Sequence, residues 1–385
     1  MNTTRILRHI NAVRCLRLLK DGRSLSRPDL ARELSLTRAT AGYAINELHE
    51  AGYTVEGELA QVEGRKGRPG VTVSLNGAGA YFLGVDIGTR VLTAVLIDLR
   101  MDVVCRIVEP TGRRFRNPDS ILERILVLIR RVIAEAGIAE GKIEGLCVSV
   151  PGVVARDGSV VNAPFLEWRD YPLRDRLVVR CSGDWIVLVC NDAFAFSNAE
   201  AASLATVKDA SVLLILMAEG IGGAVIDAGR QMMGVHGYSG EIGHMVITVA
   251  GRTDTFEMLA GAKSFAELLD PDMAVAEGVE ALMASQDEPA ARQALALWAE
   301  ALATGFANAI HLLDPGRIVL GGPMAALYPA VAEVVLTRLR KKLLPGLEAP
   351  AILTARFGAD GAAIGAAATI REAIFALPEI DKPPV

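Results

Sequence analysis

Two stretches of the chain repeat one pattern: an apolar strand, a glycine turn and a second apolar strand. The first stretch covers residues 81–98, and the second covers residues 211–227. The same unit opening two halves of a chain predicts an internal duplication. In phosphotransferases such turns hold nucleotide phosphates through backbone N–H groups. A glycine at a tight turn also occurs without any ligand, so the turns alone leave both interpretations open.

Helical and strand patterns alternate through the rest of the chain. Apolar spacing predicts helices over 118–136, 193–205, 288–313 and 324–342, and strands over 143–150 and 317–322. Alternation of this kind predicts an α/β fold with parallel or mixed sheets covered by helices. A length of 385 residues predicts two or three domains, and 51% apolar with 22% charged residues is typical of globular structure.

The first 75 residues differ from the rest in charge. They hold 12 Lys and Arg against 8 Asp and Glu, a balance of +4, whereas the remainder holds 28 against 37, a balance of −9. Helices are predicted over 2–20, from Ser26 onward and from Thr37 to Gly52. The short connection between the second and third helix indicates a helix-turn-helix.

A basic β-hairpin is expected to follow these helices, over residues 53–75. A helix-turn-helix with such a wing predicts binding to double-stranded DNA, with the third helix reading bases and the wing meeting phosphates. A helical oligomerisation module with a solvated basic loop is the alternative. The expected DNA contacts are Thr37, Arg38, Thr40, Tyr43, Asn46, Arg65, Lys66 and Arg68.

A third feature is the pair Asn191-Asp192, which follows a short apolar run over residues 185–190. Open α/β sheets place ligand sites at the carboxyl ends of strands. About fifty residues later, a glycine-rich loop supplies Glu241 and His244. Carboxylates, an amide and an imidazole together suit a polyhydroxy ligand, so we expect a sugar pocket. Taken singly, Asp192 could cap the next helix and His244 could be a satisfied core histidine.

These motifs resemble the ROK family of repressors, open reading frames and kinases, and in particular its sugar-responsive repressors. The resemblance rests on the N-terminal module with its Gly-Arg-Pro wing end, and on Asp86-Ile-Gly, Pro151-Gly152, Asn191-Asp192, Gly222-Gly223, Gly240-Glu-Ile-Gly-His244 and Gly321-Gly322.

The resemblance implies an α/β chain in three parts: a winged helix-turn-helix at 1–76, a linker at 77–80 and a body at 81–385. The body should be two-lobed, actin-like and sugar-kinase-like, with a duplicated ribonuclease H-like unit. Asp192 should occupy the catalytic base position of the kinases. The implied sugar ligands are Asn191, Asp192, Glu241, His244 and Glu257.

Departures from the family pattern bear on cofactors. Kinases of the family read Asp-x-Gly-Gly-Thr-Lys at the first turn, where this chain reads Asp86-Ile-Gly-Thr-Arg90, and Glu219 precedes the second turn. We therefore expect ATP not to bind. The cysteines of the family's zinc loop are missing between His244 and Glu257, so no zinc site is expected. Phe165 stands where many relatives have Asn. The degenerate phosphate turns comprise Asp86, Gly88, Thr89, Gly220, Gly222 and Gly223.

The expected function is that of a sugar-responsive transcriptional regulator, a repressor of carbohydrate uptake or catabolism genes. It would bind operator DNA and a sugar or sugar-phosphate effector as a homodimer or homotetramer. The five scattered cysteines and the lack of a membrane span or signal peptide suit the cytoplasm. The alternatives are an active ATP-dependent sugar kinase with an appended DNA-binding module, and a scaffold with a vestigial pocket.

Overall fold

A computed structural model describes residues 3–376, apart from 21, 59–70, 112–116, 182–183, 202–210, 236–238 and 271–272. Side chains are described from residue 8 onward. In the described ranges, every helix is too short or too polar to cross a lipid bilayer.

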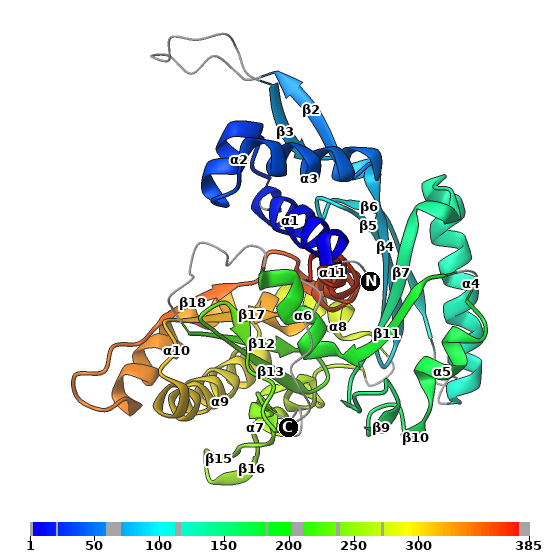
Figure 1. The fold of residues 1–385 in the computed structure, drawn as a ribbon. Helices are drawn as coiled ribbons and strands as arrows, with labels where there is room; N and C mark the ends of the chain where they lie inside the picture. Colours follow the sequence, from blue (N-terminus) through cyan, green and yellow to red (C-terminus); the bar gives the residue numbers. More distant parts are fainter. Residues whose placement is uncertain are drawn as a thin grey trace.

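The N-terminal module has the three expected helices and a small sheet in the order β1-β3-β2 (Figure 1). Ser26 caps the second helix, because its Oγ accepts the N–H of Asp29 at 3.3 Å. Thr37 caps the third helix by accepting the N–H of Thr40 at 3.1 Å. The elements are α1 (Thr3–Leu19), β1 (Leu25–Ser26), α2 (Arg27–Glu33), α3 (Arg38–Glu50), β2 (Thr54–Glu58) and β3 (Val71–Leu75).

The joint expected at 77–80 is short but packed. Gly77–Gly79 form a 3₁₀ turn, Gly77 is buried and Ala80 is fully buried. A Cβ on Gly79 would lie 2.4 Å from the carbonyl oxygen of Gly52, so the chain passes too close to the turn after α3 for any larger residue. The joint therefore fixes the module against the body.

The body contains two five-stranded sheets with the same topology, which confirms the internal duplication. The first has the order β11-β7-β4-β5-β6 and the second β18-β17-β12-β13-β14. In each, an antiparallel meander of three strands is extended by two parallel strands. The first-sheet strands are β4 (Tyr81–Ile87), β5 (Val91–Asp98), β6 (Val103–Pro110), β7 (Ile143–Val150) and β11 (Ile186–Asn191). The second-sheet strands are β12 (Val212–Met217), β13 (Ile221–Asp227), β14 (Arg230–Gln231), β17 (Arg317–Gly321) and β18 (Ala351–Thr354).

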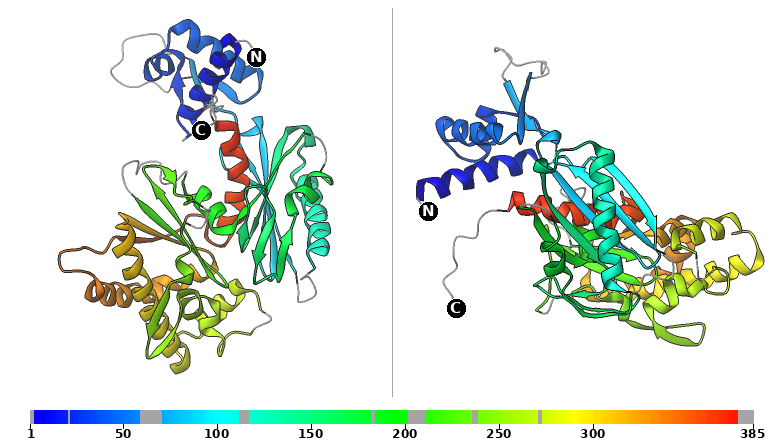
Figure 2. Two further views of the ribbon diagram at one scale, coloured as in Figure 1. Left: turned by 60° about the horizontal axis from the view of Figure 1, so that its bottom comes forward. Right: turned by 90° about the vertical axis from the view of Figure 1, so that its right-hand side faces the viewer.

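Two helices, α6 (Asp192–Ala201) and α11 (Gly361–Phe375), lie between the two sheets (Figure 2). They touch closely, because a Cβ on Gly365 of α11 would lie only 1.7 Å from the carbonyl oxygen of Ala195 in α6. Other helices cover the outer faces: α4 (Pro118–Ala136) the first sheet, and α9 (Pro289–Leu313) with α10 (Tyr328–Lys342) the second. Smaller elements are α5 (Leu173–Val178), α7 (Phe256–Ala260), α8 (Val275–Ala284), β8 (Val153–Val154), β9 (Val160–Ala163), β10 (Trp168–Tyr171), β15 (Val246–Val249) and β16 (Arg252–Thr255).

The sequence pattern predicted one helix over residues 324–342, and the structure divides it. Pro323–Leu327 form a 3₁₀ turn and α10 begins at Tyr328. Pro329 lies in the first turn of α10, where its missing N–H is tolerated and where it favours a helix start.

One hydrophobic core joins the N-terminal module to the body. It includes Leu16 and Leu19 of α1, Val73 of the wing, Phe82 of β4 and Phe375 of α11. Polar contacts reinforce it, since Arg17 Nε donates to the carbonyl of Phe375 at 2.6 Å and Lys20 pairs with Glu372 at 2.7 Å. Helix α11, which touches α6 at Gly365, therefore also contacts α1 at its C-terminal end.

Candidate functional site

The carboxyl end of β11 carries Asn191, and α6 begins at Asp192. Both side chains contact the first turn of that helix. Asn191 Oδ1 accepts the N–H of Phe194 at 3.0 Å, and Asp192 Oδ1 accepts the N–H of Ala193 at 2.8 Å. Asn191 Nδ2 also donates to the carbonyl of Gly152 at 3.0 Å, so its amide is held on both sides. The bond to the N–H three residues on, which is typical of a helix cap, is thus made by Asn191, whereas Asp192 bonds only to the N–H of its neighbour.

All five side chains expected to hold a sugar line a single cavity of about 320 Å³, which we call the acidic cleft. It lies between the two sheets, and its walls come from the end of β11, the β12–β13 turn and the loop before β15. The five are Asn191, Asp192, Glu241, His244 and Glu257.

His244 stands between two carboxylates of the acidic cleft. Its Nε2 lies 3.7 Å from Glu241 Oε2, and its Nδ1 lies 3.9 Å from Glu257 Oε1. Glu257 is largely buried at 19% exposed, whereas His244 is 66% exposed. Burial raises the pKa of Glu241, and the nearby His244 opposes that shift. Acceptors at one side of the cleft therefore face Asn191 and Asp192 across a space large enough for a monosaccharide.

The pKa of Asp192 is far above that of an ordinary aspartate. Burial raises the pKa of Asp192 to about 8, and the nearby carboxylate of Asp86 adds to the shift. Burial also raises the pKa of Asp86 to about 6, although the hydroxyl of Ser149, which donates to Asp86 Oδ1 at 2.7 Å, lowers it. A carboxyl group poised near neutral pH is suited to accept a proton from a hydroxyl group.

A direct contact joins the two glycine turns. The hydroxyl of Thr89 in the β4–β5 turn donates to a carboxylate oxygen of Glu219 in the β12–β13 turn. Gly220, Gly222 and Gly223 line the acidic cleft, whereas Asp86, Gly88 and Thr89 are absent from its described lining. An anionic side chain thus sits between the turns that hold phosphates in kinases of this architecture.

Lys263 and Phe165 also line the acidic cleft, and no pattern in the sequence pointed to Lys263. Lys263 Nζ lies 5.2 Å from the centroid of the Phe165 ring, at cation–π distance. Phe165 also lies close to Gly220, where an added Cβ would be 3.1 Å from the ring. The aromatic wall and the one cation in the described cleft lining therefore form a unit.

A tight hairpin replaces the zinc loop of the family. Strands β15 and β16 pair antiparallel and are joined by Ala250 and Gly251, with φ of 49° and 80°. Positive φ at both positions is typical of a type I′ turn. Among the residues that the structure describes, no group of three or more His, Cys, Asp or Glu side chains has metal-binding geometry.

The outer face of α3 presents the residues expected to contact DNA. Thr37, Arg38 and Asn46 are exposed, and Tyr43 is 65% exposed. Thr40 is half-buried, and its hydroxyl lies 2.9 Å from that of Thr37. Arg65, Lys66 and Arg68 at the expected wing tip lie outside the described residues.

Known proteins similar to this chain fall into two groups. The first includes a putative xylose repressor from a Caldicellulosiruptor species, 24% identical over 345 residues and covering 83% of this chain and 85% of its own length. A solved ROK family transcriptional regulator, described as a homologue of the E. coli MLC protein, matches 96% of this chain and 97% of its own, with a TM-score of 0.75 and 23% identity.

The second group includes kinases that match a smaller share of this chain. An N-acetyl-D-glucosamine kinase from Pectobacterium atrosepticum is 27% identical over 307 residues, which cover 74% of this chain and 97% of the kinase. The family model of ROK matches residues 82–373, well over half of the chain. The expected resemblance is thereby confirmed, and the chain belongs to the ROK family.

Proposed function

We propose that this protein is a sugar-responsive, DNA-binding transcriptional regulator that represses carbohydrate uptake or catabolism genes. The observation that carries the proposal is the extent of its similarities. Relatives named as xylose repressors match 83–95% of the chain, whereas the N-acetyl-D-glucosamine kinase matches 74% of it and nearly all of itself. The additional segment has the architecture of a winged helix-turn-helix, with polar and cationic side chains on the outer face of α3.

Under this proposal the N-terminal module, residues 1–76, reads operator DNA, and the acidic cleft of the body, residues 81–385, binds a sugar or sugar phosphate. A homodimer or homotetramer sets two modules on a pseudopalindromic operator. Under this proposal the two DNA-binding modules of an oligomer can take two different spacings. Sugar binding changes DNA affinity only if the sugar binds more tightly to the protein in one of these spacings than in the other.

Two binding assays test the proposal. Fluorescence anisotropy with DNA from upstream of the gene should give a specific complex at moderate salt. A thermal-shift screen of free and phosphorylated sugars, begun with D-xylose because of the names of the relatives, should give at least one saturable stabilisation. Absence of any specific DNA complex would contradict the proposal.

Arg38→Ala separates base reading from general attraction to DNA. Loss of a base-contacting arginine should cost about 1–3 kcal/mol of discrimination between operator and unrelated DNA. Arg130→Ala removes the same charge from an exposed position on α4 of the body and is the matched control. Equal losses of affinity on all sequences for Arg38→Ala would refute a reading role for the start of α3.

A sugar kinase is the second candidate, because the raised pKa of Asp192 suits a general base. The Glu219 carboxylate beside Thr89 argues against it, since an anion repels the phosphates of ATP. A coupled assay of ADP release with pentoses, hexoses and amino sugars should give no turnover. Turnover that disappears in Asp192→Asn would establish the kinase instead.

A further inference from the structure

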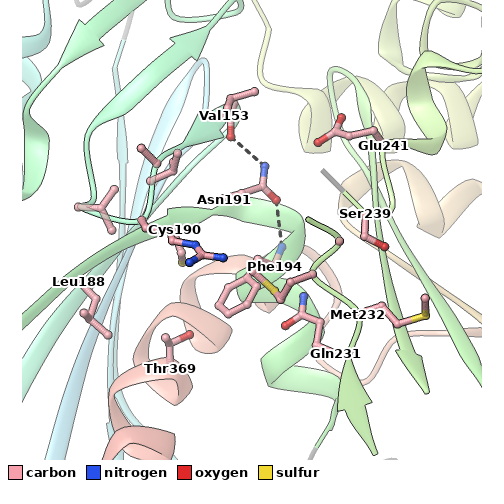
Figure 3. Close-up of a pocket in the computed structure, with 18 residues that line it drawn as sticks. Val153, Leu188, Cys190, Asn191, Phe194, Gln231, Met232, Ser239, Glu241 and Thr369 are labelled. Atoms are coloured by element: carbon pink, nitrogen blue, oxygen red, sulfur yellow. Dashed lines mark hydrogen bonds between the residues drawn. The ribbon is translucent and has the colours of Figure 1, made fainter. Parts of the chain in front are cut away.

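A second cavity of about 440 Å³ adjoins the acidic cleft and exceeds it in volume (Figure 3). We call it the apolar cavity. Five residues border both spaces and form a common wall: Gly152, Val153, Asn191, Gly223 and Glu241. Asn191 is held at this border by its bonds to the Gly152 carbonyl and the Phe194 N–H.

The two cavities differ in chemistry. Several carboxylates and an imidazole line the acidic cleft. The apolar cavity has Leu188, Phe194 and Met232 in its lining (Figure 3). Met233 also lines it, beside polar residues such as Gln231 and Ser239. Met232 is 46% exposed and Met233 is 49% exposed, which is high for large apolar side chains. Ligand pockets are mostly apolar with few polar groups, and methionine adapts its shape and makes favourable contacts with aromatic rings. This lining favours an aromatic ligand body over a sugar.

The charged side chains in the lining of the apolar cavity indicate which polar group a ligand would carry there. Arg156 is the only Lys or Arg in its described lining. Glu241 is the only acidic side chain there, and it lies 3.7 Å from His244 on the side of the acidic cleft. The Thr369 hydroxyl already donates to the Gly365 carbonyl at 2.8 Å. A guanidinium group binds a carboxylate through two parallel hydrogen bonds, so an anionic group suits Arg156.

We propose that the apolar cavity is a second ligand site, separate from the acidic cleft, that binds a small aromatic carboxylate. The ring packs among Phe194, Met232 and Met233, and the carboxylate pairs with Arg156. The volume accommodates one substituted aromatic ring with a short side chain.

The position of this site gives its ligand a route to the DNA-binding module. Leu188 belongs to the first sheet, and Gln231 ends the second, so the ligand touches both lobes. Thr369 belongs to α11, whose C-terminal end contacts α1. Because Asn191 borders both cavities, the aromatic carboxylate and the sugar should change each other's affinity by one and the same factor.

Methyl NMR with ¹³C-labelled methionine tests the site directly. Titration with benzoate and 4-hydroxybenzoate should shift the methyl signals of Met232 and Met233 in a saturable manner. The signal of Met324, which is fully buried in the second-lobe core, should stay in place. Arg156→Gln should weaken binding up to about fivefold, because it removes a charge-assisted hydrogen-bonded pair at an exposed position. Arg169→Gln, at an exposed position of β10, is the matched control and should leave the affinity unchanged.

Three results would overturn the proposal. The first is the absence of saturable shifts at Met232 and Met233 with either carboxylate. The second is that benzyl alcohol binds as tightly as benzoate, or that Arg156→Gln binds benzoate as tightly as the wild type. In either case the carboxylate would have no cationic partner. The third is strict competition with the sugar that binds the acidic cleft, which would merge the two sites into one. Because the titrations with benzoate and 4-hydroxybenzoate alone contain no sugar or DNA, failure of the first two tests leaves the regulatory function untouched.

Discussion

The raised pKa of Asp192 predicts that sugar affinity depends strongly on pH. A hydroxyl group that donates to this carboxylate requires its ionised form. With a pKa of about 8, about 1% of the unliganded protein has Asp192 ionised at pH 6. Affinity should therefore rise roughly tenfold per pH unit well below 8, about 50-fold between pH 6 and 8, and level off above about pH 9.

The same shift makes stability depend on pH with a defined sign. The folded protein holds a proton on Asp192 up to about pH 8, whereas the unfolded chain releases it near the ordinary value of 3.8. The stability that this proton contributes is fully present below about pH 3.8 and is lost as the pH rises from about 3.8 to about 8. Since the sugar favours the ionised form, the stabilisation it gives should grow as pH rises from 6 to 8.

Isothermal titration calorimetry between pH 6 and 9, with the sugar that gives the largest thermal shift, measures this dependence. Asp192→Asn should bind weakly and without the steep slope. Glu219→Gln should move the midpoint to lower pH, because the Glu219 carboxylate helps to raise the pKa of Asp192. Asp175→Asn, an exposed carboxylate of α5, should retain the wild-type profile. An affinity that is flat from pH 6 to 8.5, or that falls as pH rises, would refute the reasoning.

Two further substitutions test the helix that links the acidic cleft to the module. Gly365→Ala places a Cβ 1.7 Å from the Ala195 carbonyl oxygen, so it should lower the free energy of unfolding in urea by about 3 kcal/mol. In the control Gly141→Ala the new Cβ meets nothing within 4 Å, so the free energy of unfolding should change by less than about 0.5 kcal/mol. Arg371→Leu removes a buried guanidinium that donates to the Leu99 carbonyl at 2.8 Å, so it should cost about 1–3 kcal/mol and reduce the effect of sugar on DNA affinity. Unchanged sugar-dependent DNA binding in Arg371→Leu would contradict a role for the α11–α1 contact in transmission.

Local patterns predicted most of the secondary structure and the position of the acidic cleft. The caps at Ser26 and Thr37 and the strand that ends at Asn191 are encoded by neighbouring residues, and the structure has each of them. Family resemblance supplied Glu257, which then proved to line the same cavity as Asp192. The division between the 3₁₀ turn and α10 was missed, because apolar periodicity continues across it.

Contacts between distant segments could not be predicted in this way. Lys20 meets Glu372 across 352 positions, and Thr89 meets Glu219 across 130, without any shared motif to pair them. The apolar cavity also escaped prediction, because Met232 and Met233 lie in a loop whose sequence has no periodic signal. Such pairings depend on how the two sheets and α11 assemble, which is a property of the whole chain.

The shared core of α1, the wing and α11 limits how this protein can be re-engineered. A fragment cut after residue 76 would separate Leu16, Leu19 and Val73 from the α11 residues, such as Phe375, that belong to the same core. Chimeras that exchange DNA specificity by swapping N-terminal segments should therefore aggregate unless the partner face of α11 is exchanged with them. A functional transplant requires two pieces from opposite ends of the gene.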